Sequence, residues 1–360
     1  MSRSFSYTDA RKRRIAAAVA CVSVLALVAV ELGVRTLGIA PQLSDEYGYF
    51  VHDPALPYRT APSATFSGRS RSDEFDYEFV HNARGFRDRD RSLGRAPGVF
   101  RILALGDSFT YGAGAAYEDT YLRRLERRLN ESGSARSETE IIKAGIPRYF
   151  PEPERMLLER YGMAYTPDVV LIGFTPNDVM DTYMGLEAVA VDASGYLKTA
   201  EATLLGSPGA FLYLNSHAAR VVLTRYLGYR RGQRHTIDWP QVFVADGLYE
   251  KAWDEIEAEL TRIVAIARAG GARPVLVHIP ISPSDTAYFG IDDVSYPASR
   301  LRVWARRERV LFVDVLPAME AAATSRSLYW EKDSHPNADG YAVIADTIYE
   351  ALTEAGAVPR

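Results

Sequence analysis

The chain has 360 residues, enough for one large domain with appendages, and its 47% hydrophobic and 24% charged residues are ordinary for a globular protein. Its formal net charge of -4 gives no reason to expect a nucleic-acid partner. A single cysteine, Cys21, excludes an intrachain disulfide and a cysteine metal site.

The first expected element is a membrane anchor. Four basic residues at 11–14 precede a largely apolar run over 15–39, about 25 residues, which can cross a bilayer as a helix at ~1.5 Å per residue. The basic flank places residues 1–14 in the cytoplasm and the rest of a single-pass chain outside it, periplasmic or at the cell surface. Glu31 and Arg35 are four residues apart and are expected to pair.

A cleaved signal peptide is the alternative to this anchor. The best cleavage site follows Ala40, but Pro41 comes next and the apolar region is long for a signal. The anchor is the preferred interpretation.

Residues 40–97 have little periodicity and are rich in Pro, Ser, Arg and aromatic residues, so they are expected to form a linker with a small β appendage. Alternating residues at 75–80 predict one short strand there. The main domain is expected over 98–358. Residues 182–245 interrupt its pattern and are expected to form an insertion that suits a substrate-shaping lid.

Short apolar runs alternate with amphipathic stretches along the main domain. We expect strands over 99–105, 140–144, 168–173, 274–279 and 310–313. We expect one helix to begin shortly after residue 120, and further helices over 154–165, 248–269, 298–307 and 338–355. This alternation predicts an α/β fold with a five-stranded parallel sheet between two helical layers. A flavodoxin-like strand order is expected, because right-handed crossovers allow few topologies.

Polar residues follow several of these strands. Gly106 ends the first strand and Ser108 comes two residues later, which places a hydroxyl at the carboxyl edge of the sheet. Gly145 and Asn177 follow the second and third strands, and His335 precedes the last helix. A serine nucleophile needs a base, a group that orients the base and donors for the oxyanion.

The sequence supplies a candidate for each of these needs. His335 can accept the proton of Ser108, and Asp333 can hold the imidazole in the right tautomer. The oxyanion hole is predicted from the backbone N–H groups of Ser108 and Gly145 and the side-chain amide of Asn177.

At these residues the sequence resembles the SGNH hydrolases, also called GDSL-type esterases. The blocks that match are Gly106-Asp107-Ser108 with Gly112, then Gly145, then Asn177-Asp178, and finally Asp333 with His335-Pro336-Asn337. The resemblance covers roughly residues 98–355 and implies the three-layer α/β/α fold and the same five site residues.

The sequence departs from the family pattern at two positions. The family's acid usually lies three residues before the histidine, where this chain has Lys332, and the nearest acid is Asp333, two residues before. A similar spacing occurs in relatives that acetylate or deacetylate envelope polysaccharides. Phe109 replaces the leucine that usually follows the serine.

We therefore expect a membrane-anchored serine esterase that needs no metal or cofactor and acts on an ester-bearing small molecule or an O-acylated glycan. Its protein partners are not predicted. An O-acetyltransferase acting on envelope polysaccharide is one alternative, because it would use the same residues. A catalytically silent glycan-binding or scaffold module is the other, although intact Ser108, His335 and Asn177 argue against it.

Overall fold

The computed structural model describes residues 4–37, 39, 48–70, 72–132, 138–186, 191, 195, 197, 205–234 and 239–359. Gly38 and Ala40, at the alternative cleavage site, lie outside these residues, as do parts of the linker 40–97 and of the insertion 182–245. Contacts divide the chain into two units, residues 1–45 with 198–236 and residues 46–197 with 237–360.

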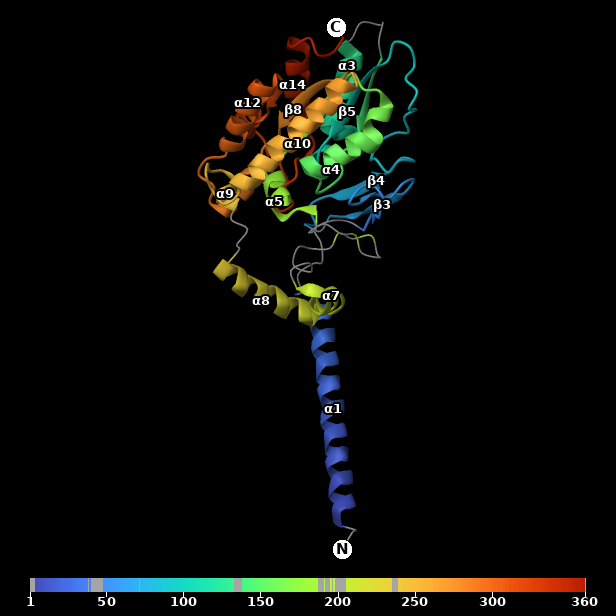
Figure 1. Cartoon of the computed structure of the whole chain (residues 1–360), viewed down its shortest axis with the longest axis vertical. Coiled ribbons are helices and arrows are strands. Elements are labelled where there is room, and N and C mark those ends of the chain that lie inside the picture. Colours follow the sequence, from blue (N-terminus) through green and yellow to red (C-terminus); the bar gives the residue numbers. More distant parts are fainter. Residues whose placement is uncertain are drawn as a thin grey trace. The chain divides into compact units, whose positions relative to one another are not determined.

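The second unit is built on a five-stranded parallel sheet (Figure 1). Its strands are β5 (Phe100–Leu105), β6 (Thr139–Lys143), β7 (Val169–Phe174), β8 (Arg273–His278) and β9 (Leu311–Asp314). They pair in the order β6-β5-β7-β8-β9, which confirms the flavodoxin-like order. Each observed strand lies within one residue of its predicted bounds, because a buried parallel strand is a continuous apolar run.

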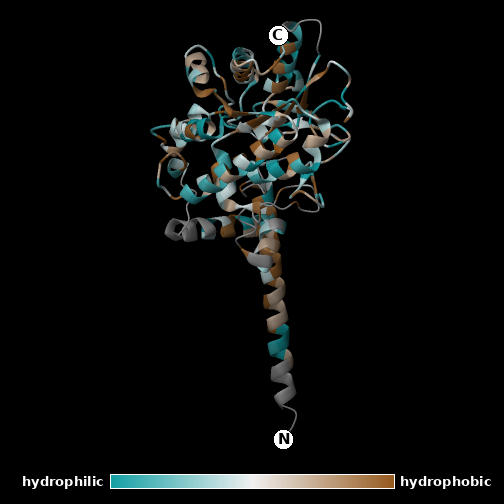
Figure 2. Cartoon of the chain, turned by 45° about the horizontal axis from the view of Figure 1, so that its top comes forward, coloured by the Kyte–Doolittle hydropathy of each residue, from teal (hydrophilic) through white to brown (hydrophobic). Residues whose placement is uncertain are grey.

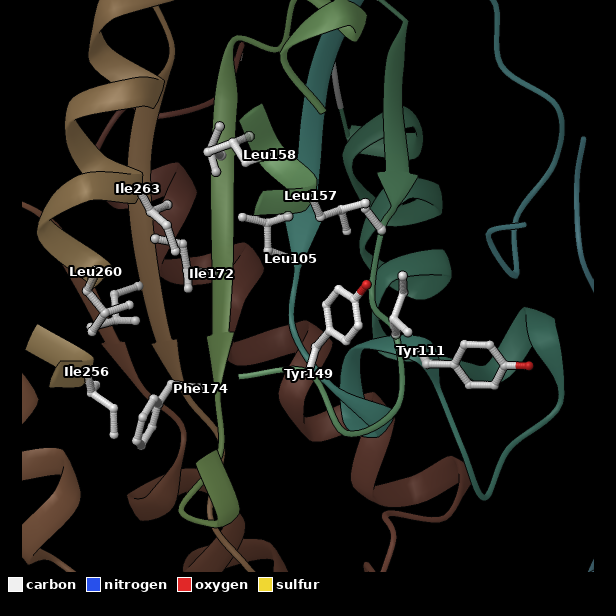
Figure 3. Close-up of a cluster of buried hydrophobic side chains, with 14 of the residues drawn as sticks. Leu105, Tyr111, Tyr149, Leu157, Leu158, Ile172, Phe174, Ile256, Leu260 and Ile263 are labelled. Atoms are coloured by element: carbon white, nitrogen blue, oxygen red, sulfur yellow. The ribbon is translucent and has the colours of Figure 1, made fainter. Parts of the chain in front are cut away.

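Successive side chains of a strand point to opposite faces, so this sheet has two cores. On one face Leu105 and Ile172 join Leu260 and Ile263 in one buried cluster (Figure 3). On the other face Ala104 and its neighbours on the sheet pack against the last helix. The predicted three-layer architecture is confirmed.

The helices of this unit agree with the predicted pattern where the apolar period is long. They are α2 (Ser108–Tyr111), α3 (Tyr121–Ser132), α4 (Pro151–Leu157), α5 (Asn177–Met184), α9 (Trp239–Val242), α10 (Glu250–Ala269), α11 (Pro283–Phe289), α12 (Tyr296–Glu308), α13 (Leu316–Ala323) and α14 (Ala338–Glu354), with short turns η1 (Tyr117–Asp119), η2 (Leu158–Gly162) and η3 (Met163–Tyr165). The helix expected over 154–165 leaves regular α geometry at Leu158. Gly162 lies close to the sheet in this segment, where an added Cβ would be 2.8 Å from Leu103 Cδ2 and would require that side chain to shift.

Two antiparallel pairs form the appendage that precedes the main sheet. One pair is β1 (Phe50–Val51) with β2 (Arg59–Thr60), and the other is β3 (Thr65–Arg69) with β4 (Asp76–Val80). Only the strand at β4 is predicted from the sequence. The others are short or exposed, so they carry no clear alternation.

The first unit contains the N-terminal helix α1 (Ser4–Leu37) and two helices of the insertion, α7 (Gly206–Asn215) and α8 (His217–Arg234). The part of α1 over Ala10–Leu37 is long and apolar enough to cross a membrane, and a signal sequence has the same property. Figure 2 shows a hydrophilic stretch of α1 followed by a hydrophobic one.

Glu31 and Arg35 form the predicted ion pair, with 2.7 Å between Arg35 Nε and Glu31 Oε1. The Glu31 carboxylate also accepts hydrogen bonds from the backbone N–H groups of His217 and Ala218, both at 2.9 Å, and so caps α8. The sequence did not predict α7 and α8, and the group that caps α8 lies far away along the chain. The lid role of the insertion stays a prediction.

Candidate active site

Ser108 begins α2 directly after β5, at the carboxyl edge of the sheet. Gly106, between strand and helix, has φ 149°, and a Cβ there would lie 2.1 Å from Thr110 Oγ1, so the tight turn requires glycine. The side chain of Asp107 caps the helix by accepting a hydrogen bond from Phe109 N at 2.9 Å. Ser108 itself is 9% exposed.

The structure brings Ser108, His335 and Asp333 together although the serine lies 227 positions from the histidine. His335 Nε2 is 2.8 Å from Ser108 Oγ, and His335 Nδ1 is 2.6 Å from Asp333 Oδ1. The ring of Phe109 packs on the imidazole with 5.2 Å between centroids. Such a chain of contacts can carry a proton away from a serine hydroxyl.

Asp333 and His335 are separated by one residue, and the backbone of that residue is unusual. Ser334 has φ 67°, a left-handed conformation that non-glycine residues rarely adopt. Its Oγ donates to Asp285 Oδ1 at 2.9 Å, and its N–H donates to Trp330 O at 3.2 Å. These bonds hold the turn in which an acid two residues before the histidine reaches the imidazole.

Gly145 follows β6 and faces α2. Its neighbours Ala144 and Ile146 donate their N–H groups to Ala104 O at 2.9 Å and Gly106 O at 3.0 Å. Within the described part of the chain, the N–H groups of Ser108 and Gly145 donate to no protein acceptor. Both donors are therefore available for an oxygen of a substrate.

Asn177 begins α5, and its side chain is fixed by two acidic residues. Asn177 Nδ2 donates to Asp107 Oδ2 at 3.1 Å and lies 3.4 Å from Asp181 Oδ2. Asp107 Oδ2 also accepts from Thr175 Oγ1 at 2.7 Å. The predicted third oxyanion donor is thus held next to the residue that precedes the serine.

Asp107, to which the sequence pattern assigns no role, joins the turn after β5 to the segment after β7. It is 1% exposed, and burial raises its pKa, although the hydrogen bonds from Thr175, Asn177 and Phe109 oppose this shift. The signal in the sequence that could have indicated a role for Asp107 is its position directly before Ser108.

Two more buried carboxyl groups lie beneath this edge of the sheet. Burial and the charge of Asp107 raise the pKa of Glu154 well above its usual range, and the same causes act on Asp178. Both shifts favour the neutral form of these two carboxyl groups.

The other histidines near this edge have structural partners. His278 ends β8, is fully buried and lies 3.1 Å from Asp314 through its Nδ1. His81 Nε2 is 2.7 Å from Tyr111 Oη, and its Nδ1 is 3.0 Å from Ala61 O. Among the described residues, no group of three His, Cys, Asp or Glu side chains is arranged to hold a metal ion.

Several solved structures match this chain at low sequence identity. The structure of TesA is 14% identical with a TM-score of 0.43, and the match covers 71% of this chain and 98% of that one. The acetylxylan esterase Axe2 from Geobacillus stearothermophilus is 15% identical with a TM-score of 0.43 over 70% of this chain and 94% of its own. The psychrotrophic esterase EstA from Pseudoalteromonas sp. is 15% identical with a TM-score of 0.39 over 71% and 97%.

A search of curated proteins found no match. The model of the GDSL-like Lipase/Acylhydrolase family, in contrast, matches residues 104–343, which include Ser108, His335 and the other predicted site residues. The chain therefore belongs to the GDSL-like lipase/acylhydrolase family and is a serine enzyme that acts on ester bonds.

Proposed function

We propose that the chain hydrolyses O-acetyl esters through an acyl-enzyme on Ser108, on the extracytoplasmic side of a membrane. The observation that carries the proposal is the unbroken chain of contacts from Ser108 Oγ to His335 Nε2 at 2.8 Å and from His335 Nδ1 to Asp333 Oδ1 at 2.6 Å. It supplies a nucleophile, a base and an orienting acid in the order that acyl transfer requires.

The reaction begins when Ser108 Oγ attacks the ester carbonyl carbon and passes its proton to His335 Nε2. Asp333 accepts the hydrogen bond of Nδ1–H and stabilises the imidazolium. The oxygen that becomes negative is held by the N–H groups of Ser108 and Gly145 and by the amide of Asn177, which releases its long 3.4 Å contact with Asp181 Oδ2 to donate to it. Each such donor lowers the barrier by about 3 kcal/mol.

The tetrahedral intermediate then collapses, and the bond between the carbonyl carbon and the alcohol oxygen breaks. His335 returns its proton to the leaving alcohol. A water molecule next attacks the carbonyl carbon of the acyl-enzyme, and His335 accepts a proton from this water. The bond between that carbon and Ser108 Oγ then breaks, His335 returns the proton to Ser108 Oγ, and the carboxylic acid leaves. The reaction transfers an acyl group and protons but no electrons, so it needs no oxidant or reductant.

Two features support the proposed substrate and location. The 9% exposure of Ser108 suits a short acyl group better than a long chain. The basic residues 11–14 before the apolar part of α1 favour a cytoplasmic N-terminus, which puts the enzyme beside glycans of the cell envelope. An O-acetylated polysaccharide is therefore the proposed substrate.

The test uses the full chain in detergent with a chromogenic acetate ester. Ser108→Ala is expected to lower kcat by about 10⁴-fold or more, while Ser325→Ala, at an exposed serine after α13, leaves kcat unchanged. Equal rates for wild type and Ser108→Ala would exclude Ser108 as the nucleophile. A faster octanoate ester would overturn the short-acyl assignment.

Two further measurements separate the remaining alternatives. The rate of ester turnover should not depend on added oligosaccharide if the enzyme is a hydrolase. A turnover rate that rises with added oligosaccharide would indicate an acetyltransferase instead. A reporter fused after residue 360 should be active only outside the cytoplasm. Cytoplasmic activity would reverse the proposed orientation.

A further inference from the structure

The tip of the β3–β4 hairpin contacts the loop that carries Asp333. The carboxylate of Glu74 accepts hydrogen bonds from three consecutive backbone N–H groups of this loop. Glu331 N is 2.9 Å from Oε1, Lys332 N is 3.1 Å from both oxygens, and Asp333 N is 2.9 Å from Oε2. Three adjacent amides that converge on one carboxylate form an anion-binding nest of the protein's own backbone.

The chemistry of this contact favours an ionised Glu74. Partial burial opposes the charge, but the hydrogen bonds from Lys332, Asp333 and Glu331 outweigh it and lower the pKa of Glu74. Charge-assisted hydrogen bonds are about twice as strong as neutral ones. The loop is therefore held at the residue whose side chain orients His335.

A second contact joins the same two segments. The ring of Phe75 lies against that of Trp330, with 5.2 Å between centroids and 30° between planes. Trp330 Nε1 donates to Gly114 O at 2.7 Å, and a Cβ on Gly114 would lie 3.1 Å from His335 Cβ. The hairpin tip, the histidine loop and the turn after α2 are thus packed together.

We propose that Glu74 is a positioning residue for Asp333 and His335, supplied by a segment that precedes the family-matched region 104–343. This inference rests on the proposed catalytic roles of Ser108, His335 and Asp333. Glu74 fixes the backbone of Asp333, so the carboxylate of Asp333 stays 2.6 Å from the imidazole Nδ1. The appendage is then part of the catalytic apparatus and more than a spacer.

The main variant is Glu74→Gln, which keeps the shape of the side chain but replaces one acceptor oxygen by an NH2 group that cannot accept from a backbone N–H. Its matched control is Glu78→Gln, at an exposed position of β4 on the same hairpin. We expect Glu74→Gln to lower kcat by about 10- to 100-fold with KM within about 2-fold, because a loosened orienting group disturbs the transition state. Glu78→Gln is expected to match wild type.

Two readouts distinguish positioning from general stability. In an Asp333→Asn background, Glu74→Gln should lower kcat by less than about 2-fold further, because it acts through Asp333. The acid limb of kcat/KM should also move to lower pH in Glu74→Gln and stay in place in Glu78→Gln, since a displaced Asp333 stabilises the imidazolium less. Full additivity of the two substitutions, with an unmoved limb, would overturn the proposal.

Ser108→Ala, assayed in parallel, separates this inference from the proposed function. If Ser108→Ala keeps full activity, the nucleophile is wrong. If Ser108→Ala is inactive and Glu74→Gln behaves as Glu78→Gln, only the positioning role fails. If Glu74→Gln loses its cooperative thermal unfolding, Phe75→Leu serves as the second variant, because it loosens the contact between the same two segments. Phe75→Leu is expected to lower kcat about 3-fold. An unchanged kcat in Phe75→Leu would overturn the role of the hairpin.

Discussion

Substituting Gly145 by alanine tests the oxyanion hole at a position where the geometry predicts a large effect. A Cβ on Gly145 would lie 2.5 Å from Tyr111 N and 2.6 Å from Thr110 C, whereas ordinary contacts begin at 3.4 Å. Tyr111 and Thr110 belong to the helix that Ser108 begins, and both contacts are with backbone atoms, so the strain cannot be relieved by a rotamer change. Gly145 must move away from Ser108 by about 1 Å, and a shift of that size can cost about 100-fold in rate.

The expected result for Gly145→Ala is a fall in kcat of about 10²- to 10³-fold, or about 3 kcal/mol of lost transition-state stabilisation. KM for the acetate ester should stay within about 3-fold, because the donor acts on the oxyanion more than on the bound ester. The control is Gly94→Ala, whose added Cβ would meet only Ser92 Oγ at 3.7 Å and should leave kcat unchanged. Thermal unfolding of both variants corrects for loss of folded enzyme. A Gly145→Ala enzyme with wild-type kcat would refute the placement of an oxyanion donor at this loop.

Two further outcomes follow from the contacts of Asp333 and His81. Asp333→Asn should lower kcat by about 10³- to 10⁴-fold, because the amide favours the wrong imidazole tautomer, and wild-type steady-state rates would exclude Asp333 as the orienting acid. Burial lowers the pKa of His81 to about 4 from an ordinary value of 6.5, so at pH values between these two the unfolded chain binds a proton that the folded chain does not. The free energy of unfolding should therefore fall by about 3 kcal/mol as the pH drops from 6.5 to 4. Over the same pH range, the difference in this free energy between wild type and His81→Gln, measured by denaturant titration, should shrink. A pH-independent difference would contradict a neutral buried His81.

Much of the sheet and of the candidate site is predictable because both follow from local patterns. Each buried strand is a continuous apolar run, and parallel strands bring the residues that follow them to one edge of the sheet. Ser108, Gly145 and Asn177 all follow such strands, and His335 precedes a helix that packs on the same sheet. Their convergence therefore depends on topology rather than on details of packing.

The parts that escape prediction depend on contacts made far away along the sequence. Glu74 lies in an exposed hairpin turn with no periodic signal, and its partners are backbone amides that any sequence would supply. Asp107 is visible in the sequence, but its hydrogen bonds to Thr175 and Asn177 are not. The cap that Glu31 provides for α8 likewise joins residues 186 positions apart. Contacts between residues so far apart leave no recognisable spacing in the sequence.

The most direct measurement is mass spectrometry of the full chain after reaction with an organophosphonate ester, which traps the nucleophile of a serine hydrolase as a stable adduct. We predict a single modification on the peptide that contains Ser108, slow modification of His335→Ala, and none in Ser108→Ala. Stoichiometric labelling of Ser108→Ala, or an adduct on another residue of the wild type, would contradict the assignment of Ser108 as the nucleophile.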